Sequence, residues 1–340
     1  MILVTGGAGY IGCHLVKSLL DLNYGVMVLD NLSTGHRGAV DGRALFINGE
    51  LGDGQLLSRI FRTYFIESVV HLAANCYVGE SVSDPLKYYF NNVSATIALL
   101  SKMVEHRVGK LVFSSTCAVY GTPDTEKIDE TFSPNPVNPY GRSKHMIEQV
   151  VRDLAEVYKL HYICLRYFNA AGADPCGVNG EDHQPETHLI PNILFNLLGK
   201  KEKITVYGND YTTRDGTCIR DYIHVNDLAE AHILALKSLA ANKHTNQCYN
   251  LGSDVGFSVK EIIEWCEKVA GKKAQVDYGE KRRGDPPKLI SASQKIYRDL
   301  GWRPQYSLQD IIETAWNWHS RCPGGYCDIG LKETIKFYDY

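Results

Sequence analysis

Short apolar runs alternate with longer amphipathic segments through the first half of the chain. The runs are rich in Val, Ile and Leu, whereas the segments between them repeat apolar residues at helical spacing. This alternation predicts a doubly wound, Rossmann-type α/β fold, in which helices cover a parallel sheet of at least six strands. We expect strands at Ile2–Thr5, Gly25–Asp30, Ala44–Ile47, Ser68–His71, Lys110–Ser114 and Tyr162–Arg166, and helices at Ile11–Leu22, Gln55–Tyr64, Pro85–Glu105 and Tyr140–Tyr158.

After Tyr167-Phe168-Asn169 the pattern becomes irregular and rich in Gly, Asp, Asn and Pro. Such a change is typical of a domain boundary, so we predict a first domain over residues 1–170 and a smaller mixed α/β lobe over residues 171–340. Two further strand-like runs, a helix between them and two helices that complete the smaller lobe are expected at Ile219–Val225, Gln247–Leu251, Asn226–Leu239, Val259–Ala270 and Leu308–Ser320. Part of residues 219–251 is expected to cross back to the first domain.

Composition narrows the class of protein. The chain has 340 residues, 44% of them hydrophobic and 22% charged, and a formal net charge of −3. A length of this order favours two domains, and the weak negative charge gives no reason to expect nucleic acid or a membrane surface as a partner. The apolar run Met1–Val4 is too short for a signal or spanning segment, so we expect a cytoplasmic protein.

The cysteines fit the same compartment. Ten are scattered without a Cys-x-x-Cys pair, which is typical of free thiols in a reducing environment. Cys322, Cys327 and His319 form the only close group, and it lacks a zinc-like spacing, so no metal site is expected.

A glycine-rich turn follows the first predicted strand. Gly6, Gly9 and Gly12 lie where that strand meets a helix, which lets the backbone approach a pyrophosphate at the helix N-terminus. Asp30 ends the next strand, where a carboxylate accepts hydrogen bonds from ribose hydroxyls and repels a 2′-phosphate. The sequence therefore predicts a dinucleotide site that prefers NAD to NADP.

Tyr140 and Lys144 form a candidate base. Pro139 favours a helix start, and positions four apart share a helix face, so the ammonium can lie beside the phenol and the cofactor. Moving a tyrosine pKa from about 10 to about 7 requires roughly 4 kcal/mol, which an adjacent cation together with a positive nicotinamide ring can supply. Ser115 or Thr116, at the end of a strand, is expected to relay a proton between Tyr140 and a sugar hydroxyl.

Together the glycine loop, the hydroxyl pair and the Tyr-x-x-x-Lys motif resemble the extended short-chain dehydrogenase/reductase family. Within it, the match is to the UDP-glucose 4-epimerases. The motifs that carry the closer resemblance are Val78-Gly79-Glu80-Ser81, Arg166-Tyr167-Phe168-Asn169, Gly208-Asn209-Asp210-Tyr211, Asp215-Gly216-Thr217, Arg220-Asp221-Tyr222-Ile223-His224-Val225, Tyr249-Asn250-Leu251-Gly252 and Trp316-Asn317-Trp318-His319.

The resemblance implies roles for residues along the whole chain. It implies a tightly bound NAD, with Tyr140 as base, Lys144 on the nicotinamide ribose and the phenol, and Thr116 or Ser115 at the sugar. The further NAD contacts that it implies are Gly6, Gly9, Tyr10, Ile11, Gly12, Asp30, Asn31, Glu50, Leu51, Leu72, Ala73, Asn91, Ser114 and Tyr167. The UDP-sugar contacts that it implies are Thr116, Asn169, His188, Leu189, Thr205, Tyr207, Arg220, Tyr222, Arg282, Asp285 and Leu289, with Arg220 and Arg282 on the phosphates and Asp285 near the uridine.

The activity implied is interconversion of UDP-galactose and UDP-glucose by transient oxidation at sugar C4, in a homodimer formed through the helices at Pro85 and Tyr140. Three positions depart from the pattern: Cys76 stands where some members carry lysine, Glu50 replaces an aspartate, and Leu289 is smaller than the tyrosine of strict members. The alternatives are an epimerase that also or mainly acts on UDP-N-acetylglucosamine and UDP-N-acetylgalactosamine, a nucleotide-sugar 4,6-dehydratase, and a dinucleotide-binding regulator without catalysis.

Overall fold

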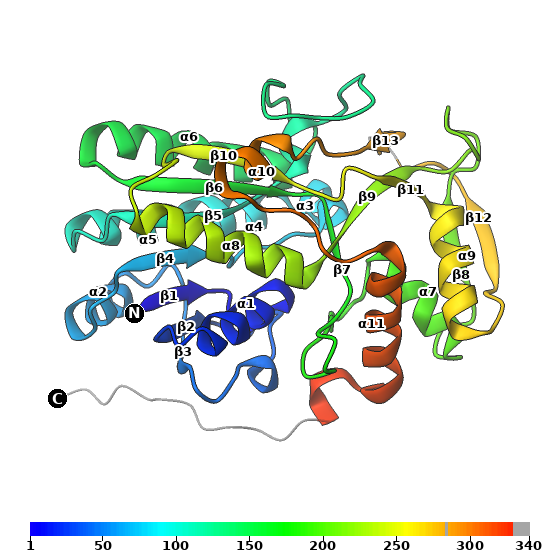
Figure 1. The fold of residues 1–340 in the computed structure, drawn as a ribbon, viewed down its shortest axis with the longest axis horizontal. Helices are drawn as coiled ribbons and strands as arrows, with labels where there is room; N and C mark the ends of the chain where they lie inside the picture. Colours follow the sequence, from blue (N-terminus) through cyan, green and yellow to red (C-terminus); the bar gives the residue numbers. More distant parts are fainter. Residues whose placement is uncertain (283–284, 329–340) are drawn as a thin grey trace.

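The computed structural model describes residues 1–282 and 285–328, and seven strands in that part of the chain form one parallel sheet (Figure 1). These strands are β1 (Ile2–Thr5), β2 (Val26–Asp30), β3 (Leu45–Asn48), β4 (Ser68–His71), β5 (Lys110–Thr116), β6 (His161–Tyr167) and β10 (Gln247–Leu251). They pair in the order β10-β6-β5-β4-β1-β2-β3. The order reverses direction at β1, which makes the sheet doubly wound, and the predicted fold class is confirmed.

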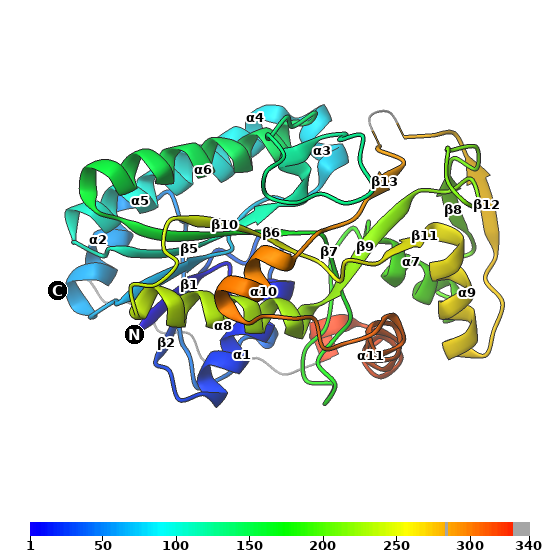
Figure 2. The same ribbon diagram turned by 45° about the horizontal axis from the view of Figure 1, so that its top comes forward.

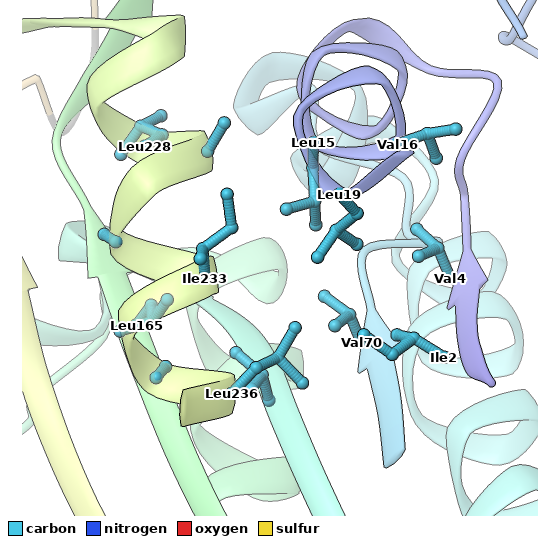
Figure 3. Packing of buried hydrophobic residues seen from close by; sticks show 14 of the residues in the cluster. Ile2, Val4, Leu15, Val16, Leu19, Val70, Leu165, Leu228, Ile233 and Leu236 are labelled. Carbon is cyan, nitrogen blue, oxygen red and sulfur yellow. The ribbon is translucent and has the colours of Figure 1, made fainter. Parts of the chain in front are cut away.

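Helices cover both faces of this sheet. One face carries α1 (Tyr10–Asp21) and α8 (Val225–Ala240), and the other carries α2 (Gly54–Thr63), α5 (Ala95–Glu105) and α6 (Pro139–Tyr158) (Figure 2). Figure 3 shows leucine and isoleucine side chains of α1 and α8 meeting Val70 and Leu165 of the strands. The buried strands read as continuous apolar runs because a parallel sheet is covered on both sides.

The segment expected as one helix, Pro85–Glu105, is divided. It forms α4 (Pro85–Tyr88), then a π-helical segment η2 (Tyr89–Ser94), and only then α5. A short helix, α3 (Val78–Ser83), precedes it. Asn92 in the π-helical segment accepts a hydrogen bond from the Asn75 N–H, and its Nδ2 donates to the Asn75 carbonyl and to Ser143 Oγ. We infer that these side-chain bonds hold the widened turn, because they fix Asn92 against the loop after β4 and against α6.

The smaller lobe contains a second sheet in which β9 (Ile219–His224) pairs with β7 (Asn169–Ala171), β11 (Gly256–Ser258) and β13 (Lys288–Leu289). Beside it β8 (Ile204–Tyr207) pairs with β12 (Val276–Gly279). The helices α7 (Leu189–Leu197), α9 (Val259–Ala270) and α11 (Leu308–Arg321) pack around one apolar cluster. The remaining elements are α10 (Gln294–Leu300) and the short helices η1 (Arg37–Ala39), η3 (Cys117–Tyr120) and η4 (Gly325–Asp328).

The chain passes between the two sheets more than once. Strand β9 belongs to the smaller sheet, whereas β10 pairs with β6 and α8 packs on α1. Part of residues 219–251 therefore lies on the larger lobe and part on the smaller, and the division into domains near residue 170 stays a prediction. No helix within residues 1–282 and 285–328 is both long enough and apolar enough to span a bilayer.

Candidate functional site

The glycine turn between β1 and α1 is closely packed. A Cβ atom at Gly6, whose φ is +74°, would lie 2.5 Å from the Ala73 nitrogen, and one at Gly12 would lie 2.2 Å from the Gly6 carbonyl oxygen. Helix α1 starts at Tyr10, and no side chain caps its first turn. The first N–H groups of α1 are thus left for an anion that approaches the turn, with Tyr10 and Ile11 in the first helical turn.

Asp30 lies at the carboxyl end of β2, beside this turn. Its carboxylate accepts hydrogen bonds from the Ala8 and Leu32 N–H groups, both at 2.9 Å. Burial raises the pKa of Asp30, and the two backbone hydrogen bonds act in the opposite direction. Next to it, Asn31 Nδ2 donates to both carboxylate oxygens of Glu50, and Leu51 follows in the same turn after β3. A carboxylate fixed at this edge fits the ribose of a dinucleotide.

Tyr140 and Lys144 lie in the first turns of α6. The helix starts at Pro139, and the Asn138 side chain caps it by accepting a hydrogen bond from the Gly141 N–H. Lys144 is 3% exposed, and its Nζ donates to the Ser114 carbonyl of β5 at 2.7 Å. The cap and this bond fix the first turns of the helix against the carboxyl end of the sheet.

Among the effects of the protein's own groups, burial is the largest cause of the pKa shifts of Tyr140 and Lys144. It raises the pKa of Tyr140 above its ordinary value, and the nearby Thr116 only partly offsets this. It also lowers the pKa of Lys144 to about 8. The expected shift of the phenol pKa toward neutrality is not met by the protein groups alone, because removal from water opposes both charged forms.

Lys144 should leave a signature in the pH dependence of stability. Its folded pKa of about 8 lies below the ordinary value of 10.5, so the unfolded chain binds more protons between these pH values. We expect the free energy of unfolding of the cofactor-free protein, relative to Lys144→Met, to rise by up to about 3 kcal/mol from pH 8 to 10.5. Equilibrium unfolding in urea measures it. Lys237→Met, at an exposed position on α8, serves as control. If the free energy of unfolding depended on pH equally in Lys144→Met and Lys237→Met, the assignment of the lowered pKa to Lys144 would be contradicted.

The two candidate hydroxyls point to different partners. Thr116 lies near the Tyr140 phenol, whose pKa it acts to lower, and its Oγ1 accepts from the Ala118 N–H at 3.1 Å. Ser115 is 1% exposed, and its Oγ donates to Glu148 Oε1 of α6 at 2.6 Å. Alternation along a strand sends neighbours to opposite faces, so this geometry favours Thr116 as the hydroxyl at the reacting group.

A buried polar network that the sequence did not reveal lies on the Ser115 side. Arg166 donates through Nε and Nη2 to the two Glu148 oxygens at 2.8 and 2.7 Å, and through Nη1 to Tyr120 OH at 2.7 Å. Tyr120 OH in turn donates to Asn250 Oδ1. Burial acts to raise the pKa of Glu148, but the bonds to Arg166 and Ser115 and the nearby His145 outweigh it and lower the pKa to about 2. The only sign of this network in the sequence was that Arg166 lies within an apolar strand and Glu148 on an apolar helix face.

The other expected cofactor residues surround the same edge of the sheet. Leu72 and Ala73 follow β4 and meet Gly6, and Ser114 accepts from Lys144. Asn91 donates to Asn92 Oδ1. The hydroxyl of Tyr167 forms a hydrogen bond with His232 Nε2 of α8 at 2.6 Å. The Tyr167 side chain therefore lies in the apolar core between the sheet and α8.

Three of the expected UDP-sugar residues, Arg220, Asp285 and Leu289, lie on the smaller lobe next to the loop after β5. Arg220 pairs with Asp285, and the Arg220 charge acts on the pKa of the buried thiol Cys117, the residue after Thr116. Leu289 pairs with Arg220 in the sheet and packs with Cys117 and Phe168. Arg220 and Leu289 thus lie close to Cys117, the neighbour of Thr116.

The remaining members of this set lie along neighbouring strands and one helix start. Asn169 pairs with Tyr222 across β7 and β9, Thr205 and Tyr207 lie on the exposed side of β8, and the guanidinium of Arg282 lies 4.1 Å from the Tyr207 ring centre. His188 precedes Leu189 at the N-terminus of α7. His319 and Cys322, two members of the cysteine and histidine group for which no metal was expected, pack with apolar side chains. The side chain of the third member, Cys327, lies outside the described residues.

Known proteins are similar to this chain in sequence and in fold. A family model described as the NAD dependent epimerase/dehydratase family matches residues 2–252. The chain belongs to this family. A UDP-glucose 4-epimerase from Halalkalibacterium halodurans is 52% identical over 326 residues, which cover 96% of this chain and 97% of that protein.

Two solved structures of family members have the same fold. The UDP-glucose 4-epimerase from Brucella ovis, in complex with NAD, matches with a TM-score of 0.90 and 45% identity, over 93% of this chain and 97% of its own. The enzyme from Bifidobacterium longum, in complex with NAD⁺ and UDP, matches with a TM-score of 0.91 and 36% identity, over 95% of this chain and 99% of its own.

The described residues fit the dinucleotide that the family description names. The turn at Gly6 and Gly12 leaves no room for side chains, the start of α1 is uncapped, and the Asp30 carboxylate lies beside both. These three features are what a pyrophosphate and an adjoining ribose require.

Proposed function

We propose that the chain is an NAD-dependent epimerase that interconverts UDP-galactose and UDP-glucose, with a role in galactose metabolism. The observation that carries this proposal is that Tyr140, close to Thr116, and the buried Lys144 lie in the first turns of α6, where Lys144 Nζ donates to the Ser114 carbonyl at the same sheet edge as the glycine turn. A phenol, a short hydroxyl and an ammonium in this arrangement can move a proton to and from a sugar hydroxyl.

Each of these residues has a distinct role in the proposal. Tyr140 takes the proton of the sugar 4-hydroxyl, with Thr116 as the relay, and returns it on the other side of the ring. Lys144 holds the nicotinamide ribose and adds positive charge next to the phenol. When bound, NAD supplies a hydride acceptor and donor for C4. The residues proposed to hold it are Gly6, Gly9, Tyr10, Ile11, Gly12, Asp30, Asn31, Glu50, Leu51, Leu72, Ala73, Asn91, Ser114 and Tyr167.

The UDP part of the substrate supplies the binding energy. Arg220 and Arg282 are proposed to bind the diphosphate, because guanidinium groups match phosphate oxygens in a fork geometry. In the structure Arg220 pairs with Asp285, which we propose is freed to meet the uridine when the diphosphate takes its place. Because UDP anchors the substrate, the flat 4-keto ring can turn over without leaving the site.

Incubation of the purified protein with UDP-galactose and no added cofactor tests the proposed activity. We expect UDP-glucose as the product, identified by its proton NMR signals. A 4-keto-6-deoxy sugar would instead indicate a dehydratase, and unchanged UDP-galactose would indicate a protein that binds the dinucleotide without catalysis. The sequence after β5, Thr116-Cys117-Ala118-Val119-Tyr120-Gly121, carries no carboxylate that a dehydratase would need there.

Leu289 is proposed to set the room at the sugar 2-position. It is 9% exposed and packs with Cys117 and Phe168, next to Thr116. A leucine leaves more space than a tyrosine would, so a parallel incubation with UDP-N-acetylgalactosamine measures whether 2-acetamido sugars share the site.

We also propose a homodimer through α3, α4, α5 and α6. Large apolar side chains are exposed on these helices and on the π-helical segment between them, and such a patch is typical of an interface between protein chains. They are Val78, Val82, Leu86, Phe90, Ile97 and Met146. Light scattering in solution determines the mass.

A reducing cytoplasmic location is proposed from the free cysteines within the described part of the chain.

A further inference from the structure

Four side chains of one loop converge outside the groups that the proposed mechanism uses as acid or base. Glu181, His183, Glu186 and His188 lie between β7 and α7, and one ligand atom of each lies within 4.8 Å of the others. Three of the side chains are shielded from water, with exposed fractions of 4% for Glu181, 5% for Glu186 and 12% for His183. Two imidazoles and two carboxylates form a donor set that zinc accepts in proteins.

The spacing of these atoms matches one small tetrahedral ion. His183 Nδ1 lies 3.2 Å from Glu181 Oε1 and 3.5 Å from Glu186 Oε2, while His188 Nδ1 lies 2.7 Å from Glu181 Oε1 and 3.0 Å from Glu186 Oε1. Ligand atoms about 2.0–2.1 Å from a tetrahedral zinc ion are about 3.3 Å from one another. The four distances lie around this length, and they join five atoms, because His183 and His188 face different oxygens of Glu186.

Hydrogen bonds account for only part of the cluster, where His188 Nδ1 and Glu186 Oε1 form one at 3.0 Å. Glu181 Oε1, Glu186 Oε2 and His183 Nδ1 are buried, and none of them meets a partner in hydrogen-bond geometry within the described chain. Buried polar atoms are nearly always paired. Glu186 Oε1 is held from behind by the Thr187 and His188 N–H groups, which fixes the carboxylate toward the centre of the cluster.

We propose that Glu181, His183, Glu186 and His188 bind one Zn²⁺ ion in a four-coordinate structural site. With all four positions taken by protein, the ion has no open position for a substrate or a water nucleophile. The motif Glu-x-His-x-x-Glu-x-His in a loop rich in Pro and Asp carries this site in the sequence. It departs from our expectation of no metal, because that expectation followed the cysteines.

The position of the loop indicates what the ion would do. The Glu181 carbonyl accepts from Trp318 Nε1 at 3.0 Å, and the Asp182 carbonyl lies 3.0 Å from His36 Nε2, so the loop joins α11 to the segment after β2. At its other end His188 is the N-cap residue of α7 and precedes Leu189, and the resemblance implies UDP-sugar contacts for both residues. A bound ion would therefore clamp the start of α7 to the lobe that carries the glycine turn.

The zinc content of the purified full-length protein tests this site, and it does not depend on enzymatic activity. After dialysis against metal-free buffer we expect one zinc per chain by mass spectrometry of the elements. We expect Glu181→Gln, which keeps the size and removes the charge, to lower the zinc affinity by about 100-fold or more. His244→Asn, at an exposed histidine far along the chain, should bind zinc like the parent.

A second measurement keeps the test decisive if Glu181→Gln folds poorly. We expect ZnCl₂ to raise the thermal midpoint of the chelator-treated parent protein, and to leave that of His188→Gln unchanged. The rival explanation is an ion-pair cluster held by protons on the two histidines. Zinc below 0.1 per chain with no thermal response, or equal zinc binding by parent, Glu181→Gln and His188→Gln, would support that rival and overturn the proposal.

Discussion

Replacement of Tyr140 by Phe is expected to lower kcat for UDP-galactose by about 1,000-fold, within the range that a positioned acid or base contributes. The change removes one oxygen atom, the phenol oxygen that lies near Thr116 and that we propose takes the sugar proton. The ring itself stays, with its edge-on contact to Tyr88 at 6.5 Å. Binding of NAD and of UDP should therefore remain within a few-fold of the parent, as measured by calorimetry.

A second tyrosine of the same helix provides the control. Tyr158 ends α6 and is 56% exposed, so Tyr158→Phe should retain the parent kcat. Epimerisation by Tyr140→Phe at more than a tenth of the parent rate would assign the base to another group. A loss of NAD binding as large as the loss of rate would instead assign Tyr140 a role in holding the cofactor.

Replacement of Arg166 by Met is expected to cost about 3–5 kcal/mol in the free energy of unfolding, because it leaves a carboxylate buried without its cation. Glu148 is 1% exposed, and Arg166 supplies two of its hydrogen bonds. The same change removes a donor from Tyr120. Equilibrium unfolding in urea at pH 7 measures the effect.

Two further variants test whether the loss of stability comes from breaking the buried Arg166–Glu148 pair or from the loss of any arginine side chain. The double variant Arg166→Met, Glu148→Leu should recover most of the lost stability, since no charge is then left buried. Arg298→Met removes an exposed partner of Asp299 and should cost less than about 1 kcal/mol. If Arg166→Met and Arg298→Met were equally stable, the network beneath Ser115 would not be a source of stability.

The sequence predicted the larger lobe well because its signals are local. Apolar runs such as Leu3 and Val28 with their neighbours lie in strands buried on both faces, so pattern and structure follow from the same requirement. Helix α6 was predicted from its start for a similar reason: Asn138 and Pro139 act within one turn. The glycine turn could be located because Gly6 and Gly12 sit where a Cβ atom would collide with backbone.

The smaller lobe was predicted less completely because its elements depend on distant partners. Strand β13 is two residues long and exists through its pairing with β9, and β8 pairs with β12 far along the chain. In the larger lobe the π-helical turn was missed for the same reason, because it depends on Asn92 reaching Asn75 and Ser143, which no periodicity encodes. A pattern of apolar positions carries no information on such pairings.

The same distinction holds for the candidate site. Spacing placed Tyr140 and Lys144 in one helix, but it could not decide between Ser115 and Thr116, because that depends on Glu148 occupying one face of β5. Nor could it give the direction of the Tyr140 pKa in the chain alone, since burial is a property of the assembled fold. The cluster at Glu181 was missed because its four side chains become a unit only when the loop closes.

The fate of the hydrogen on C4 tests the central claim most directly. The purified protein is incubated in ordinary water with UDP-galactose that carries deuterium at C4, and the UDP-glucose formed is analysed by NMR. The account predicts that the deuterium stays on C4, because the hydrogen leaves and returns within one closed site while only the hydroxyl proton passes through Tyr140. Exchange of the deuterium for hydrogen from the solvent, or no UDP-glucose at all, would contradict it.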